Sequence, residues 1–252
     1  MKFALLNRSS APADAMVKIR EALELHLQHV CAAWERLPIT VAWYPDQAVA
    51  PLGEIALIAF DDPDQPGAEG YHDVDPRGVP YGRAFLNVIP GRALLYDPSG
   101  RGQCLAAVLE HEADEIVGDT FAADWSDGPF VDVNTNLTRA SVARELCDPV
   151  QDSAYDLVLA DGTRTSATNF VFPAWFDGKS IGERYDFMNI IKAALTLAPG
   201  GYAIARNAPG SETSVENDER SIDAWRLAHS NACGSRRTKR IKSIAKMTTP
   251  LT

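Results

Sequence analysis

The residues most suited to chemistry lie within one short segment, residues 105–119, which reads LAAVLEHEADEIVGD. The segment predicts a helix, on which His111 and Glu115 lie one turn apart on the same side. Both side chains can then reach one metal ion, and Glu112 between them can polarise a water molecule. This is the logic of the H-E-x-x-H helix of zinc hydrolases, with glutamate replacing the second histidine. The alternative is an ordinary i,i+4 pair of His111 and Glu115 at the rim of the helix.

The faces of this predicted helix, residues 102–118, favour the metal interpretation. At 100° per residue, Glu112 falls on the apolar stripe, and His111 and Glu115 fall on its flank. Glu110 and Asp114 fall on the opposite side, where we expect them to face solvent. A buried carboxylate without a partner is costly, and a divalent cation would remove that cost. We therefore expect a cation beside the buried face of the helix.

A third protein ligand is needed, and the sequence offers three candidates. Glu145 is favoured, Asp119 lies two turns beyond His111, and Asp148 shares the segment of Glu145. Their alternative roles are, in that order, a surface acid, an acid of the loop after the helix and an Asp-Pro turn former. Zinc is the expected metal, but one histidine among several carboxylates leaves calcium or manganese open.

Four segments follow one another in an order that resembles the uncharacterised zincin-like proteins of phage and prophage genomes. They are HEADEIVGD at 111–119, ELCDP at 145–149, NFVFPAWF at 169–176 and PGGY at 199–202. The resemblance covers roughly residues 1–206 and implies a small relative of the gluzincin metallopeptidases. It implies a small mixed sheet and a long backing helix at 13–37, which support the active-site helix, with strand 83–89 at the sheet edge above the cleft. His111, Glu115 and Glu145 would be the ligands and Glu112 the general base.

The resemblance implies a metal-dependent hydrolase of peptide or peptidoglycan amide bonds. A glutamate ligand gives the metal more charge than histidine, which should raise the pKa of bound water above the value of about 7 at catalytic zinc. The alternative is therefore a non-catalytic virion protein of the capsid or tail that keeps a degenerate metalloprotease fold. A small interaction or anti-host factor is a third possibility.

The order of predicted elements indicates an α+β fold rather than a βαβ alternation. We expect strands at 2–7, 39–44, 54–60 and 83–89, and a hairpin at 155–160 and 164–172. The 252 residues, 46% of them hydrophobic, suit one zincin-like domain at 1–206 with a hairpin-rich second part from 119. Residues 207–252 would be an extension with a weak helix around 218–230.

Charge is unevenly distributed along the chain. The net charge is −10, yet residues 231–252 contain six basic residues and no acid. An acidic body argues against specific nucleic-acid binding, whereas the basic tail could dock onto phage particle proteins. We expect no membrane span and no signal peptide, so the expected location is the host cytoplasm or the virion. The four cysteines are expected to be free and buried, with disulfides as the alternative that their even number leaves open.

Three further histidines are expected to lie away from the chemistry. His72 belongs to a loop rich in proline and glycine, 61–80, where a solvated surface position is the favoured interpretation. The alternative is that His72 or Tyr71 reaches over the cleft and stabilises an oxyanion. His26 and His29 lie on the first helix and are expected to face solvent.

Overall fold

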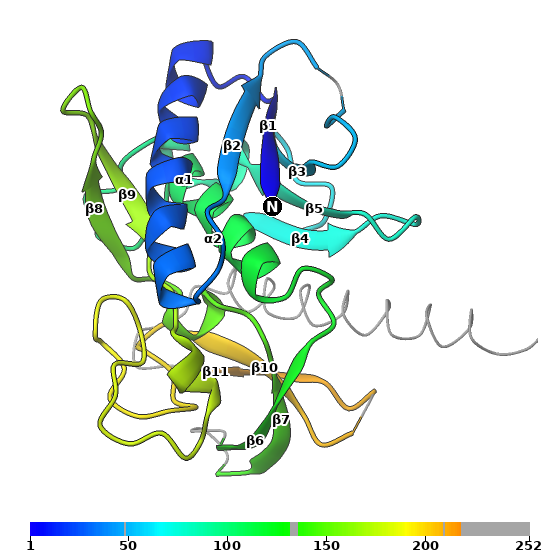
Figure 1. The fold of residues 1–252 in the computed structure, drawn as a ribbon, viewed down its shortest axis with the longest axis vertical. Coiled ribbons are helices and arrows are strands. Elements are labelled where there is room, and N and C mark those ends of the chain that lie inside the picture. Colours follow the sequence, from blue (N-terminus) through cyan, green and yellow to red (C-terminus); the bar gives the residue numbers. More distant parts are fainter. Residues whose placement is uncertain (48, 132–135, 209, 218–252) are drawn as a thin grey trace, which may run out of the picture.

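The computed structural model describes residues 1–47, 49–131, 136–208 and 210–217, and within them the fold is mixed α+β. Two α-helices and three sheets make up this part of the chain (Figure 1). The weak helix predicted at 218–230 and the basic tail at 231–252 lie outside the described residues. None of the described helices is long and apolar enough to cross a membrane.

The main sheet has five strands in the order β2-β1-β3-β5-β4. Its strands are β1 (Lys2–Arg8), β2 (Thr40–Tyr44), β3 (Ile55–Phe60), β4 (Gly70–Val74) and β5 (Pro80–Phe85). The first four in this order run parallel, and β4 pairs antiparallel with β5 at the edge. One expectation was wrong here, because the predicted edge strand at 83–89 is the interior strand β5. The elements β1, the first helix and β2 form a single parallel crossover within a fold that is α+β, as predicted.

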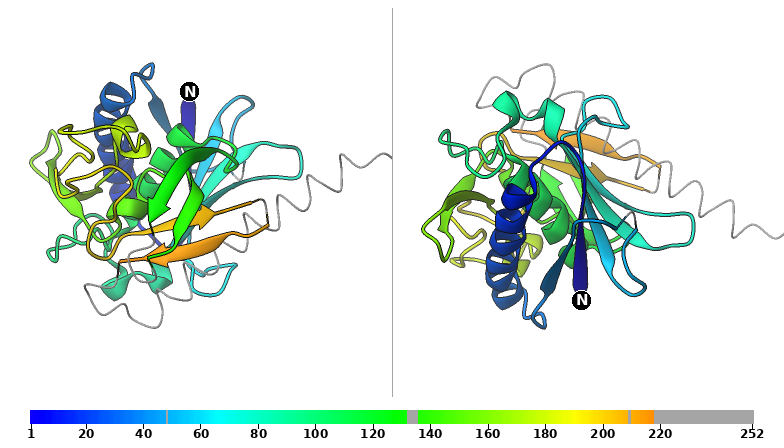
Figure 2. Two further views of the ribbon diagram at one scale, coloured as in Figure 1. Left: turned by 90° about the horizontal axis from the view of Figure 1, so that it is seen from below. Right: turned by 90° about the horizontal axis from the view of Figure 1, so that it is seen from above.

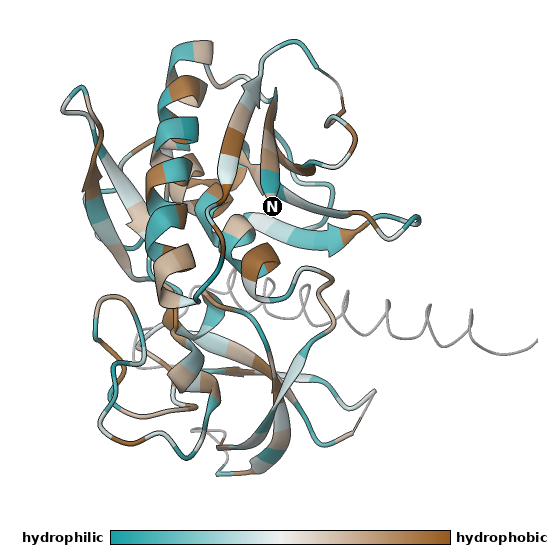
Figure 3. Cartoon of the chain, viewed as in Figure 1, coloured by the Kyte–Doolittle hydropathy of each residue, from teal (hydrophilic) through white to brown (hydrophobic). Residues whose placement is uncertain are grey.

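The first helix, α1 (Ala13–Ala33), fills the crossover between β1 and β2. Its apolar residues recur every three or four positions and are buried, which gives the alternating brown and teal bands of Figure 3. The helix ends four residues earlier than the predicted residue 37. Glu35 adopts a left-handed conformation with φ of 50°, which no helix continues through.

The second helix, α2 (Leu105–Gly118), packs against β3, β4 and β5 on one side and against α1 on another. Both helices lie on the same face of the sheet (Figure 2). A hairpin of β8 (Ala154–Val158) and β9 (Arg164–Thr168) covers the remaining side. Every residue of α2 except His111 is buried, so the expected solvent-facing side with Glu110 and Asp114 does not exist. The prediction failed because α1 and the hairpin cover that side.

The lower part of the molecule in Figure 1 contains a four-stranded antiparallel sheet of order β11-β10-β7-β6. Its strands are β6 (Trp125–Val131), β7 (Thr138–Ala143), β10 (Tyr202–Arg206) and β11 (Thr213–Glu216). Strand β11 pairs with β10, so this sheet includes residues on both sides of the predicted boundary at residue 206. Short 3-10 turns complete the fold: η1 (Leu86–Val88), η2 (Pro90–Arg92), η3 (Asp148–Val150) and η4 (Pro173–Phe176). Cys31, Cys104 and Cys147 are free and buried, as predicted, and Cys233 lies outside the described residues.

Candidate metal centre

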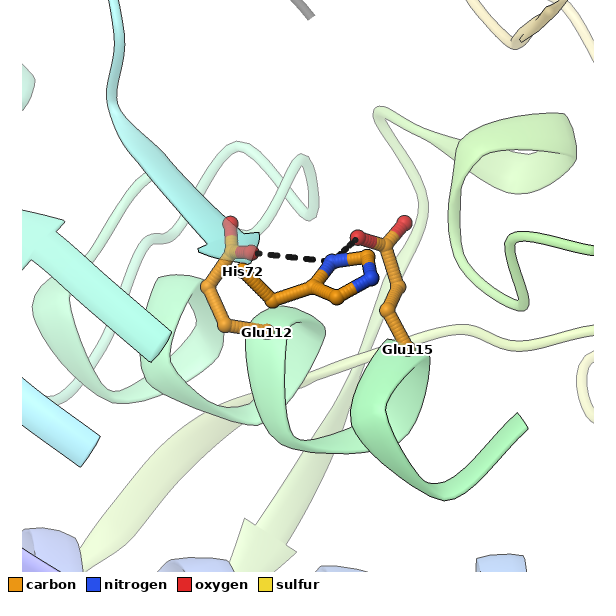
Figure 4. A group of neighbouring side chains, drawn as sticks. All are labelled: His72, Glu112 and Glu115. Carbon is orange, nitrogen blue, oxygen red and sulfur yellow. Dashed lines mark hydrogen bonds and ion pairs between the residues drawn. The ribbon is translucent and has the colours of Figure 1, made fainter. Parts of the chain in front are cut away.

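Six ionisable side chains from three parts of the chain converge beside α2. The edge strand β4 supplies His72, the helix supplies three residues, and the segment 145–148, which follows β7 and ends at the first residue of η3, supplies two. The six are His72, His111, Glu112, Glu115, Glu145 and Asp148. Figure 4 shows how the imidazole of His72 lies between the carboxylates of Glu112 and Glu115.

The contacts of His72 define the first half of the cluster. Its Nδ1 lies 2.9 Å from Glu115 Oε2 and 3.8 Å from Glu112 Oε2. Its Nε2 lies 3.8 Å from Glu145 Oε2 and makes no hydrogen bond to the described residues. All four side chains are only about 5% exposed, so charge here is poorly screened by water.

The contacts of His111 define the second half. Its Nε2 lies 2.9 Å from Glu115 Oε1 and 3.3 Å from Asp148 Oδ1. The His111 side chain is 14% exposed and that of Asp148 only 2%. Neither carboxylate oxygen of Asp148 makes a hydrogen bond within the described part of the chain, although His111 is near. A nearly buried carboxylate whose oxygens accept no hydrogen bond is well suited to bind a metal ion.

Two glycines let the edge of the sheet approach the helix at Glu112. A Cβ atom on Gly70 of β4 would lie 2.5 Å from Glu112 Oε1 and 2.8 Å from Val108 Cγ1. A Cβ atom on Gly82 of β5 would lie 3.1 Å from Glu112 Cβ. With glycine at both positions, β4 can bring His72 to within reach of the helix.

A third glycine positions the segment that carries Glu145 and Asp148. A Cβ atom on Gly118, the last residue of α2, would lie 1.8 Å from Leu146 Cδ1. Leu146 is fully buried, and its carbonyl accepts a hydrogen bond from the Val171 N–H at 2.8 Å. The segment is therefore held against the C-terminal end of the helix, with an acid on each side of Leu146.

The electrostatics of the second half indicate a cluster that holds protons when no cation is bound. Burial alone would lower the pKa of His111, but the charge of Glu115, the contact with Asp148 and the charge of Glu112 outweigh it and raise that pKa well above its ordinary value. Burial, together with the charge of Glu115, raises the pKa of Asp148 to about 7. Burial opposes ionisation of Glu115 too, but His111 and His72 hold the pKa of Glu115 below its ordinary value.

The residues fit a divalent cation by donor type and by spacing. Two sets of three donors lie within 4.8 Å of one another: His72, Glu112 and Glu115 in one, and His111, Glu115 and Asp148 in the other. Tetrahedral ligands at the usual zinc distance of about 2.1 Å are roughly 3.4 Å apart. The four nitrogen-to-oxygen distances within these sets, 2.9, 3.8, 2.9 and 3.3 Å, lie on either side of that value.

Among the predicted site residues, the structure brings together His111, Glu112, Glu115 and Glu145. It places Asp119 differently, since its two carboxylate oxygens accept hydrogen bonds from the backbone N–H groups of Ala123 and Asp124 at 2.9 and 3.0 Å. Asp119 thus stabilises the turn after α2 and belongs to neither donor set. Asp148, the least favoured candidate in the sequence, is the acid beside His111.

His72 does not occupy the solvated surface position that was expected for it, since its side chain is only 5% exposed. The segment 61–80 contains the strand β4, and its edge position against β5 turns His72 toward α2. The proline and glycine residues around it predict a loop, so the only available signal was the histidine itself between Tyr71 and Asp73. A contact across 43 residues, such as that of His72 with Glu115, cannot be inferred from local spacing.

A second polar network lies on the opposite side of α2 and corrects the expectation for His26 and His29. His26 is fully buried, and its Nε2 lies 2.7 Å from Asp114 Oδ2. Tyr155 Oη lies 2.9 Å from His26 Nδ1 and 3.0 Å from His29 Nδ1. His26 faces inward because Asp114 on the neighbouring helix needs a buried partner.

No protein-family model, no curated protein and no solved structure matched this chain.

Proposed function

We propose that this chain is a zincin-like metal-binding protein that hydrolyses peptide or other amide bonds. The observation that carries the proposal is the donor set of His111, Glu115 and Asp148 on and beside α2, with the carboxylate of Glu112 on the same helix. A long backing helix, a mixed sheet with an antiparallel edge strand and a second helix bearing the donors support the zincin-like interpretation.

The proposed chemistry divides between the cation and the side chains. A divalent cation at this position would polarise the scissile carbonyl and make water easier to deprotonate. Glu112 takes the proton from the attacking water and delivers it to the leaving amine. His111, Glu115 and Asp148 would hold the cation, while Leu146 against Gly118 fixes the segment that carries Asp148. Zinc is the expected ion, and manganese is the next best match for one imidazole with carboxylates.

The test combines metal analysis with hydrolysis of a peptide library and of purified peptidoglycan. The wild-type protein is expected to contain a divalent metal, to hydrolyse one of these substrates, and to lose that activity to a chelator. Glu112→Gln is expected to abolish hydrolysis while the ion at His111 stays bound. Glu110→Gln is the matched control, because Glu110 lies on the same helix but faces Thr168 of β9.

Three results would contradict the proposal at different levels. Absence of metal from the folded wild-type protein would remove its basis. Hydrolysis by Glu112→Gln at the wild-type rate would remove Glu112 from its role. A metal-loaded protein without activity on either substrate would favour the non-catalytic virion protein instead.

A further inference from the structure

Glu115 has a different histidine at each of its two carboxylate oxygens. Oε2 lies 2.9 Å from His72 Nδ1, and Oε1 lies 2.9 Å from His111 Nε2. The two histidines come from different elements, β4 and α2, and each has a further carboxylate beside it. Glu112 lies beside His72, and Asp148 lies beside His111. The cluster therefore consists of two donor sets that share only Glu115.

Each donor set is complete enough for a cation of its own. One imidazole nitrogen and two carboxylate oxygens make three protein ligands, the number that catalytic zinc sites use. Glu145 Oε2 lies 3.8 Å from the remaining ring nitrogen of His72, Nε2. A carboxylate at the outer nitrogen of a liganding histidine is the usual support for such a residue. His72 is thus placed as a ligand through Nδ1, with the Glu145 carboxylate beside Nε2 but beyond hydrogen-bond distance.

The charge of the cluster also exceeds what one cation balances. Four carboxylates, Glu112, Glu115, Glu145 and Asp148, lie around two imidazoles, and all four side chains are at most 5% exposed. With neutral imidazoles, a single divalent cation leaves two negative charges in a nearly buried site. Two divalent cations neutralise the site completely, which removes the cost of unpaired buried charge.

From these observations we infer that the site binds two divalent cations, one between His72, Glu112 and Glu115 and one between His111, Glu115 and Asp148, with Glu115 as the bridging ligand. The inference rests on the proposed metal-binding function and extends it. Hydrolytic sites with two metals commonly hold them about 3.5–4 Å apart, a separation that one carboxylate can bridge. Glu112 would then hold the second cation through one carboxylate oxygen, which would leave its other oxygen for the proton transfer of the proposed function.

The number of bound ions tests this inference directly. The full chain is stripped with a chelator, titrated with zinc chloride, freed of excess zinc and analysed for zinc per chain. The wild type is expected to hold two ions. His72→Ala and Glu112→Gln are each expected to hold one, and His111→Ala is also expected to hold one. The double variant His72→Ala/His111→Ala is expected to hold none.

His29→Ala is the matched control for the histidine variants, because His29 contacts Tyr155 on the other side of the molecule's second helix. It is expected to keep two ions. Circular dichroism checks that each variant is folded, and His72→Gln replaces His72→Ala if the smaller side chain prevents folding.

The outcomes separate this inference from the proposed function. One ion in the wild type and one in His72→Ala would contradict the cation site at His72 and would leave the proposed function unaffected. One ion in the wild type and none in either histidine variant would mean a single position shared by both histidines, and would also overturn the inference. No ion in any folded protein would overturn both proposals.

Discussion

Gly118 and Leu146 form the tightest contact around the site, and a single methyl group tests it. Alanine favours helices over glycine by about 1 kcal/mol, so Gly118→Ala in an open helix would be stabilising. Here the new Cβ would lie 1.8 Å from Leu146 Cδ1, and overpacking costs about 1–3 kcal/mol. We expect Gly118→Ala to lower the free energy of unfolding in urea and to weaken zinc binding, because Leu146 carries Glu145 and Asp148 with it.

The double variant Gly118→Ala/Leu146→Ala identifies the cause. If the clash is responsible, Gly118→Ala costs less when Leu146 is already alanine, and the two changes are not additive. An equal cost of Gly118→Ala in both backgrounds would show that Leu146 is not the obstacle.

Glu110 gives the folded protein a pH dependence of its own. Burial raises the pKa of Glu110 to about 8, against an ordinary value of 4.5. Between pH 4.5 and pH 8, Glu110 is protonated in the folded protein and ionised in the unfolded protein. Glu110 therefore lowers the free energy of unfolding as the pH rises through this range. Glu110→Gln, whose amide oxygen can still accept the Thr168 N–H, removes this loss.

The measurement is urea unfolding of the wild type and of Glu110→Gln at pH 5 and at pH 8.5. Relative to the wild type, Glu110→Gln is expected to have a higher free energy of unfolding at pH 8.5 than it has at pH 5. A constant difference across this range would show that Glu110 does not titrate as its burial indicates.

Some residues of the site can be predicted from the sequence around them, and others cannot. His111, Glu112 and Glu115 follow from the i,i+4 spacing on one helix, which the sequence displays directly. His72 depends on pairing between β4 and β5 and on packing of β4 against α2, which no local pattern reports. Asp148 was ranked low because an Asp-Pro pair is usually a turn former, and here it begins η3 as well as facing His111.

Helices α1 and α2 are joined by a buried ion pair whose removal should be costly. Both His26 and Asp114 are fully buried, and the charges of Asp114 and Glu110 raise the pKa of His26 although burial alone would lower it. His26→Leu leaves the Asp114 carboxylate buried without its partner, at a cost of about 3–5 kcal/mol. The double variant His26→Leu/Asp114→Leu should recover part of this loss, because two apolar side chains need no such pairing.

Unfolding of the two variants in urea distinguishes pairing from packing. If the double variant is as unstable as His26→Leu or worse, the loss comes from the shape of the imidazole rather than from the unpaired acid.

The elements differ in how far the sequence specifies them. The helix α1 and the hairpin of β8 and β9 are formed by segments that are continuous in the chain, and both were predicted. The strands β6 and β7 were not predicted, because 119–140 is polar and their pairing is with each other and with β10. Burial on all sides of α2 was also missed, since it depends on α1 and on a hairpin about 50 residues later in the chain. Glu110 and Asp114, which the helical periodicity places on the solvent side, are therefore buried.

At the scale of the whole molecule, the site joins the sheet, α2 and the segment after β7, so cation binding should stabilise the entire fold. A ligand that binds only the folded state at 100 times its dissociation constant adds about 2.7 kcal/mol. For a chain of this size that corresponds to a rise of roughly 5–11 °C in the melting temperature. Zinc should produce this rise in the wild type and a chelator should reverse it. Asp148→Ala should reduce the rise, because Asp148 lies 3.3 Å from His111 in one donor set.

Asp119→Ala provides the contrast that makes the melting experiment decisive. Asp119 holds the turn after α2 through two backbone N–H groups, so its loss should lower the melting temperature with and without zinc by the same amount. The rise on adding zinc should therefore match that of the wild type, although the variant is less stable throughout. A rise that disappears in Asp119→Ala but persists in Asp148→Ala would reverse the assignment of these two acids. Asp119 would then be the ligand and Asp148 the former of the η3 turn.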